Sequence, residues 1–179
     1  GLMDTEERKR LDRDRRADFI LDKAEGLVFE RGFEATTMDD IAKASGYTKR
    51  SVYLYFRDRD EVFFALTLRG QRLLHAALAS AAREAGAGDE RTRAAEAETS
   101  TIRAFGRAFY RFSLAYPGYF DLIMTYESKR HSYALGRVDE ATPFSACQNL
   151  SVEYGELLAQ ALERDMSAGL ISSRMDARQ

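Results

Sequence analysis

The chain has 179 residues, of which 45% are hydrophobic, and a formal net charge of −2. This apolar content can fill a buried core, which excludes a wholly disordered chain. The single cysteine, Cys147, excludes an intrachain disulfide and favours a reducing compartment, so we expect a cytoplasmic protein. Uninterrupted apolar runs fall short of the roughly 20 residues of a spanning helix, so we expect no membrane partner. Gly1 and Leu2 resemble a tag remnant ahead of Met3.

Apolar residues recur at steps of three and four along most of the chain, and the chain has only two prolines, which predicts an all-α fold. The first helix is expected from about Arg13 to Arg31, ahead of Gly32, a residue that suits a helix end. The second helix begins at Thr36 or Thr37, since each has an aspartate three residues later, as in an N-terminal capping box.

A third and a fourth helix follow closely. Gly46 supplies a turn, and Thr48 caps a third helix that is expected to end near Phe56. A long fourth helix is expected from Asp58 to about Glu84. Its expected inward residues are Phe63, Leu66, Gly70, Leu73, Leu74, Ala77 and Ala81.

Three more helices are expected in the second half of the chain. The small-residue segment 85–89 breaks the fourth helix, and Pro117 ends the next helix and starts another. A loop from about Lys129 to Thr142 precedes a final helix from Pro143 to about Ala168. The fifth helix carries an apolar seam of Ile102, Phe105, Phe109, Phe112 and Tyr116, with Arg103, Arg107 and Arg111 roughly opposite and solvated; the final helix is expected to bury Phe144, Cys147, Leu150, Tyr154, Leu157, Leu158 and Ala161.

Residues 36–56 have the layout of a helix-turn-helix, whose second helix enters the major groove of DNA. Thr48 places a hydroxyl at the start of that helix, which suits a phosphate group. Arg50, next to Lys49, can pair bidentately with guanine, and Ser51 is small enough to permit close approach.

Tyr53 and Tyr55 follow on the same predicted helix. Their phenolic groups can donate hydrogen bonds to phosphates, or the rings can serve as ordinary packing. Because two tyrosines two residues apart on a helix cannot both face one core, at least one is expected to be exposed. Val52 and Phe56 are expected to attach the helix to the core.

Basic side chains concentrate in this region although the whole chain is slightly acidic. Residues 43–59 contain five basic residues and one acidic residue, Asp58, so their local charge is +4. Such a patch attracts phosphates without making the whole surface adhesive. Residues 8–10 (Arg-Lys-Arg) begin a mixed-charge arm that is either solvated or in contact with DNA. The five basic residues are Lys43, Lys49, Arg50, Arg57 and Arg59.

Residues 15–64 resemble the DNA-binding region of the tetracycline-repressor (TetR) family. The resemblance implies a homeodomain-like three-helix DNA-binding domain, expected at 3–57, and a helical effector-binding and dimerisation domain at 58–179. The matching features are Gly32-Phe33, Thr36-Thr37, Ile41-Ala42, Gly46, Thr48, Tyr53, Tyr55-Phe56 and Arg59.

The family resemblance also implies a function: a bacterial homodimeric repressor that binds a palindromic double-stranded operator and is released by a small molecule. Arg50 stands where the family often has glycine, and Arg59 where lysine is usual, so operator preference cannot be transferred. By position, the resemblance assigns phosphate contacts to Thr37, Thr48, Tyr53, Tyr55 and Arg59, and base contacts to Lys49, Arg50 and Ser51.

The rest of the chain resembles the family in architecture alone. Its eleven phenylalanines and nine tyrosines make an apolar or aromatic effector plausible, although the same side chains could be plain core. The expected lining of a largely apolar cavity is Phe105, Phe109, Phe112, Tyr116, Phe120, Ile123, Met124 and Phe144. Polar side chains that could orient a ligand are His75, Arg103, Tyr110, Glu127 and His131.

Two alternatives to a ligand-responsive repressor stand beside it. One is a DNA-binding regulator without a small-molecule ligand; the other is an enzyme. The sequence has no phosphate-binding glycine loop, no metal-ligand cluster and no nucleophile paired with a base, so we expect no catalysis, no metal and no cofactor.

Family members usually end with further dimerisation helices. Either the chain is truncated, or dimerisation uses the helix from Phe144 to Met166.

Overall fold

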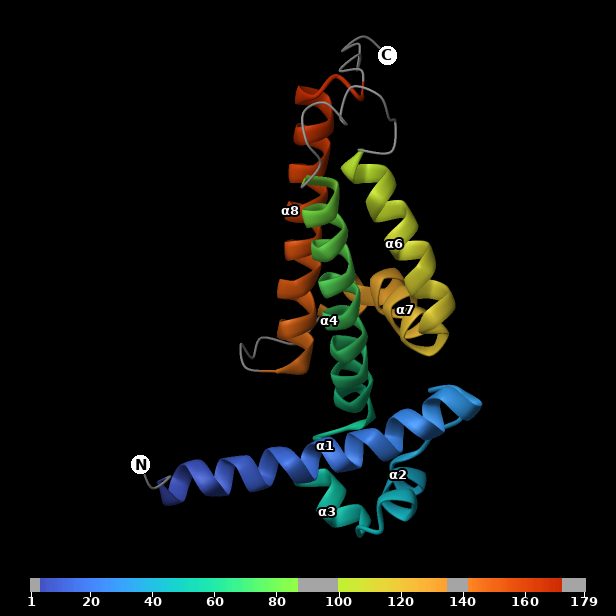
Figure 1. Ribbon diagram of the computed structural model, residues 1–179. Helices are drawn as coiled ribbons and strands as arrows, with labels where there is room; N and C mark the ends of the chain where they lie inside the picture. The colour runs from blue at the N-terminus through green and yellow to red at the C-terminus, as the bar shows by residue number, and fades with distance from the viewer. Residues whose placement is uncertain (1–3, 87–99, 135–141, 172–179) are drawn as a thin grey trace.

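The computed structural model describes residues 4–86, 100–134 and 142–171. Within these ranges every regular element is a helix, which confirms the all-α expectation. Helices α1–α3 form a group at one end of α4, and α6, α7 and α8 pack around the remainder of α4 (Figure 1). The helices are α1 (Thr5–Arg31), α2 (Met38–Ser45), α3 (Lys49–Tyr53), α4 (Arg59–Gly86), α6 (Thr101–Ala115), α7 (Pro117–Ala134) and α8 (Pro143–Ser167).

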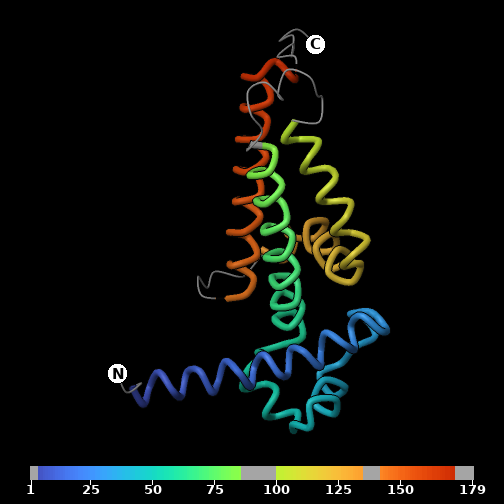
Figure 2. Tube along the Cα trace, viewed as in Figure 1, coloured from blue at the N-terminus to red at the C-terminus, as the bar shows by residue number. Residues whose placement is uncertain are grey.

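Helix α4 belongs to both parts of the molecule. Its first turns lie beside α1, and the helix then continues without interruption into the bundle, where α6 and α8 flank it (Figure 2). The sequence predicted this long helix closely, from 58 to about 84. The expected break at 85–89 is described only as far as Gly86, and residues 87–99 and 135–141 lie outside the described ranges.

Helix α1 begins earlier than predicted. It starts at Thr5 instead of about Arg13, so the residues taken for a mixed-charge arm are helical and project beyond the α1–α3 group (Figure 1). Glu, Arg, Lys and Leu are all good helix formers, and Lys9 forms an ion pair with Glu6 one turn away at 2.8 Å. Alternating charge therefore supports a solvated helix here.

The predicted caps locate α2 and α3. Of the two candidates for the start of α2, Thr37 is the capping residue: its side chain accepts from the Asp40 N–H, and Asp40 accepts in return. Thr48 caps α3 as predicted. The predicted end of α3 near Phe56 is wrong, because the helix ends at Tyr53. A turn follows, in which the N–H groups of Leu54 and Tyr55 donate to carbonyls three residues earlier and that of Phe56 donates to Val52.

One hydrophobic cluster connects the α1–α3 group with the bundle. It contains the inner residues of α1 and the predicted anchors Val52 and Phe56. Of the residues expected to face inward on α4 and α8, it includes Phe63, Leu66, Leu74, Phe144 and Cys147, with Tyr154 packed against it. Two of those predictions are wrong: Leu73 is 40% exposed and Leu158 is 47% exposed. Helical period identifies an apolar stripe, but it does not reveal how much of that stripe a neighbouring helix covers.

A buried carboxylate fastens the start of α6 to the end of α8. Asp165 is 1% exposed and accepts hydrogen bonds from the Ser100 hydroxyl at 2.7 Å and from the N–H groups of Thr101 and Ile102 at 2.9 and 3.0 Å. Burial opposes ionisation, but these hydrogen bonds outweigh it and lower the pKa of Asp165. The carboxylate caps α6 from a residue more than 60 positions away, which no local pattern predicts.

We expect Asp165→Asn to lower the free energy of unfolding by about 2 kcal/mol at neutral pH, because a charge-assisted acceptor is lost. Since the folded pKa lies below the ordinary 3.8, the stabilisation is present above that value and is lost as the pH falls through the folded pKa. Urea unfolding of both proteins at pH 7 and pH 3 measures the difference, which should shrink at pH 3. Asp121→Asn, at an exposed position of α7, is the control and should change little. A deficit of equal size at both pH values would contradict the assignment.

Glycine permits α7 to approach α1. A Cβ built on Gly118 would lie 2.5 Å from the ring of Phe29, which itself contacts Tyr119 edge-on with ring centroids 5.0 Å apart. Any side chain at this position therefore displaces the Phe29 ring. Gly26, on α1, has nothing within 4 Å of such a Cβ.

We expect Gly118→Ala to destabilise the fold by about 1–3 kcal/mol through overpacking against α1. Gly26→Ala is the matched control and should be neutral or slightly stabilising, since alanine favours a helix interior. Thermal unfolding followed by circular dichroism compares the two variants. Equal midpoints for both would show that α1 and α7 do not pack closely in solution.

Candidate nucleic-acid interface

The two helices of the predicted helix-turn-helix are joined at Gly46. Its φ of 71° lies in the left-handed region, where glycine avoids the strain that a Cβ would introduce. The chain then turns, and the Thr48 side chain accepts from the Ser51 N–H at 3.1 Å while the two hydroxyls lie 2.8 Å apart. Val52, on the inner face of α3, is fully buried, so the opposite face of the helix is exposed to solvent.

That exposed face carries the residues predicted to contact bases. Lys49 and Arg50 are exposed, and Ser51 is half-buried next to its cap. The structure therefore brings all three predicted base-contacting residues onto the same short helix. Their contacts with DNA stay a prediction.

Ion pairs within the protein reduce the charge available to DNA. Lys49 lies 3.3 Å from Asp39, Arg59 lies 3.2 Å from Glu34, and Arg57 lies 3.9 Å from its neighbour Asp58. Among the described residues, the other two cations of the patch, Lys43 and Arg50, have no ion pair or hydrogen bond. Arg50 is thus the uncompensated charge on α3.

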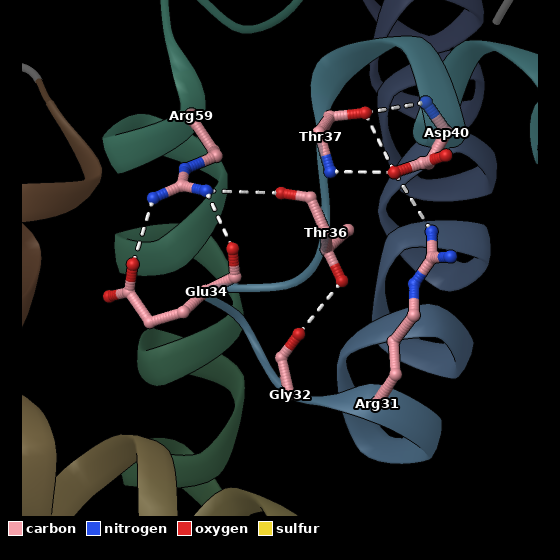
Figure 3. Close-up of polar contacts among 7 residues, drawn as sticks. All are labelled: Arg31, Gly32, Glu34, Thr36, Thr37, Asp40 and Arg59. Carbon is pink, nitrogen blue, oxygen red and sulfur yellow. Dashed lines mark hydrogen bonds and ion pairs between the residues drawn. The ribbon is translucent and has the colours of Figure 1, made fainter.

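Arg59 is engaged with the loop between α1 and α2. Its guanidinium donates to the backbone carbonyls of Glu34 and Thr36, both at 3.3 Å, and to the Glu34 carboxylate, as Figure 3 shows. It also lies over the ring of Phe33, 4.6 Å from the centroid. The planar fork suits several carbonyls at once, which is a physical reason for arginine here.

Thr37 is similarly occupied. Its hydroxyl and its N–H both donate to Asp40, at 2.7 and 2.9 Å, and Arg31 pairs with the same carboxylate at 3.0 Å (Figure 3). The hydrogen bonds from Thr37, assisted by Arg31, lower the pKa of Asp40. For both Thr37 and Arg59 the internal contacts organise the loop ahead of α2, and a direct phosphate contact stays a prediction.

The two tyrosines have different surroundings. Tyr53 is 44% exposed at the end of α3, whereas Tyr55 is half-buried against Tyr47. The expectation that at least one is exposed is confirmed. Sequence reasoning missed the partners of Tyr55. Arg13 stacks over its ring at 5.2 Å and donates to the Leu54 carbonyl at 2.6 Å, and a hydrogen bond to Tyr55 raises the pKa of Arg16.

The structure does not bring the eight predicted ligand-lining residues together. A groove between α4 and α6 is lined by Phe112 and Tyr116, but not by the other six. Phe109 packs on Phe120 edge-on at 5.4 Å, and Met124 is exposed. The remaining members, Phe105, Ile123 and Phe144, are buried core.

The polar candidates also lie apart from this groove. Glu127 accepts from Ser151 at 2.7 Å, and His75 lies 3.4 Å from Glu153. Tyr110 and His131 are exposed. None of the five predicted polar residues, Arg103 included, lines the groove; two arginines that were expected to be simply solvated, Arg107 and Arg111, do.

The geometry thus defines a helix-turn-helix protein with a helical bundle attached. Residues 20–66 match the family described as bacterial regulatory proteins, tetR family. Among curated relatives, an uncharacterised HTH-type regulator of Bacillus subtilis, YfiR, is 41% identical over 51 residues, 28% of this chain and 25% of the relative. IcaR of Staphylococcus epidermidis, a negative regulator of a biofilm operon, is 37% identical over 46 residues, 26% of this chain and 25% of IcaR.

Solved structures resemble a larger part of the chain. AibR bound to isovaleryl coenzyme A and operator DNA superimposes with a TM-score of 0.59 and 22% identity, covering 88% of this chain and 75% of AibR. PfmR of Thermus thermophilus gives a TM-score of 0.56 and 22% identity, covering 86% and 73%. These likenesses show the fold of the bundle. The chain matches only about a quarter of the length of the two curated relatives.

We expect Arg50→Ala to weaken binding to a selected DNA site roughly tenfold or more, because a base contact by arginine contributes about 1–3 kcal/mol. Arg72→Ala, at an exposed position about 20 Å along α4 from its first residue, serves as control and should bind like the parent protein. Fluorescence anisotropy with labelled duplex measures both. Unchanged affinity and unchanged sequence preference for the Arg50 variant would remove this residue from the interface.

Proposed function

We propose that the protein is a transcriptional repressor that binds operator DNA as a homodimer and is released by a small molecule. In this proposal residues 3–57 bind DNA and residues 58–179 bind the effector and the second subunit. Such a regulator acts in the bacterial cytoplasm and needs no catalysis. The observation that carries the proposal is α3, which is capped by Thr48, anchored by Val52 and exposed along a face that presents Arg50.

The comparisons support each half of this proposal. The family match covers the helix-turn-helix itself, and IcaR is named as a negative transcriptional regulator. AibR, whose fold resembles this one, has been crystallised with both an acyl-coenzyme A and operator DNA. A groove between α4 and α6 supplies a place where a small molecule could act on this chain.

A polar junction supports mechanical coupling between the two parts. Arg69 of α4 forms ion pairs with α1 through Asp22 at 2.7 Å and Glu25 at 3.1 Å. Tyr119 of α7 donates a hydrogen bond to the same Glu25 carboxylate. Because α1 packs on α2, and α2 on α3, a ligand that displaces α4 or α7 would also move α3, the helix proposed to enter the major groove.

Release then follows from spacing. Two recognition helices reach successive major grooves when they are about 34 Å apart, so a shift of α4 in both subunits removes the match. The ligand must bind the mismatched state more tightly, with a coupling free energy of about 1–3 kcal/mol. The same coupling would make operator DNA weaken ligand binding.

An exposed apolar side of α8 is the proposed dimer contact. Its outward residues recur at roughly helical spacing, and large apolar side chains in such a row usually meet a partner surface. This supports the alternative in which dimerisation uses the helix from Phe144 to Met166. The exposed row consists of Val152, Leu158, Leu162 and Met166.

Affinity selection of bacterial genomic fragments, followed by sequencing at near-physiological salt, tests the function. We expect enrichment of a short palindrome upstream of a few genes, because a symmetric dimer reads two half-sites. The Arg50→Ala protein, selected in parallel, should lose this enrichment while it retains weak general binding. Binding without sequence preference by the parent protein would contradict the proposal.

A further inference from the structure

The groove between α4 and α6 has the size of a small-molecule site. Its volume is about 720 Å³, within the range of ligand pockets, and the two helices that form it run antiparallel (Figure 1). Six of its thirteen lining residues are alanines, and their small methyl groups leave a gap between the two helices that larger side chains would close. These residues are Ala77, Ala81, Ala85, Ala104, Ala108 and Ala115.

Two arginines stand on the α6 side of the groove. Arg107 and Arg111 both line it, both are exposed, and they are one helical turn apart. Among the described residues, neither guanidinium has an ion pair or hydrogen bond. Like charges at this spacing destabilise a helix, and an anion held between them would remove the repulsion.

The groove is polar at one end and apolar at the other. Near the end of α4, Glu84 lines it and accepts a hydrogen bond from Ser80 at 3.1 Å. At the opposite end the lining consists of Leu73, Phe112 and Tyr116. An anionic group is therefore repelled by the first end, whereas an apolar chain fits the second. Leu73, exposed in this structure, is a side chain that such an occupant would cover.

We propose that this groove binds an amphiphilic organic anion. Its carboxylate or phosphate lies between Arg107 and Arg111, and its apolar part lies against Leu73, Phe112 and Tyr116. The inference rests on the proposed function in one respect: it specifies the chemical class of the effector. Neutral apolar compounds of the same length bind more weakly, because they leave the two guanidinium groups uncompensated.

Isothermal titration calorimetry of the full chain with octanoate, octyl phosphate and octan-1-ol, all below micellar concentrations, tests this. The two anions distinguish a carboxylate from a phosphate ligand, and the alcohol has the same chain without the charge. We expect saturable binding of at least one anion, at least about tenfold tighter than the alcohol, since hydrogen bonds to charged groups exceed neutral ones by such amounts.

Variants locate the binding site. Arg107→Gln and Arg111→Gln should each weaken binding of the anion about tenfold and leave the alcohol unaffected. Arg83→Gln makes the same charge change on α4 outside the groove lining and should bind the anion like the parent. Ala108→Leu, which fills the groove, should weaken all three ligands. Circular dichroism confirms that each variant is folded.

Several outcomes would overturn the inference: no saturable anion binding, equal affinity for alcohol and anion, or the same loss in Arg83→Gln as in Arg107→Gln. The proposed function fails differently. If octan-1-ol but not the anions releases DNA from the selected palindrome, the repressor function stands and the anion site falls. If an anion binds through Arg107 and Arg111 without affecting DNA binding, the anion site is confirmed and the proposed release of DNA by this ligand is wrong.

Discussion

The packing of α1 against α4 and α7 determines the position of α3, because α3 packs on α2 and α2 packs on α1. Asp18, Asp22 and Glu25 lie on one face of α1 at steps of four and three, and all three reach Arg69 of α4. Burial of the guanidinium opposes its charge, yet the carboxylates outweigh this effect and raise the pKa of Arg69. Because Asp18 and Asp22 are well exposed, water screens their share, and the half-buried Glu25 makes the stronger contact.

Local signals in the sequence predicted the α1–α3 group well. Thr37 and Thr48 are capping residues whose partners lie three positions away, so a short window contains the whole interaction. The end of α3 was missed since it depends on how Val52 and Phe56 reach the core, which is a tertiary matter. The start of α1 was missed for another reason. Its strongly charged first residues were interpreted as an arm outside the helix, although most of them have a high helix propensity.

Contacts between distant segments were beyond sequence reasoning. Asp165 looks like one more charge on a polar face, and its role appears only once α8 lies beside the start of α6. Arg59 is predicted to contact a phosphate group, and the fold adds a second role that the sequence did not reveal: its guanidinium holds the Glu34–Thr36 loop. In both cases the residue type was informative, but the partner was supplied by the three-dimensional arrangement.

The predicted ligand-lining residues do not share one cavity in this structure, and there is a physical reason. Aromatic residues were expected to line a cavity, but large rings fill space. Of the expected residues, Phe109 packs on Phe120 with centroids 5.4 Å apart, and Phe144 packs on Phe64 and Tyr126 with centroids 4.9 and 6.3 Å apart. Open volume arises instead where small side chains face each other, as the alanines of α4 and α6 do. A sequence search for cavities therefore benefits from matching small residues on neighbouring helices as well as apolar seams.

The position of the groove gives it a direct connection to the DNA-binding part. Tyr116, at the corner between α6 and α7, lines the groove, and its ring centroid lies 6.4 Å from that of Tyr119. Tyr119 in turn contacts Phe29 and donates to Glu25, both on α1. Because α7 packs closely on α1 at Gly118, a ligand that displaces Tyr116 can act on α1 through Tyr119, by its contact with Phe29 or its hydrogen bond to Glu25. In the proposed function a shift of α1 passes to α3 through α2, so coupling through this corner can act together with a shift of α4.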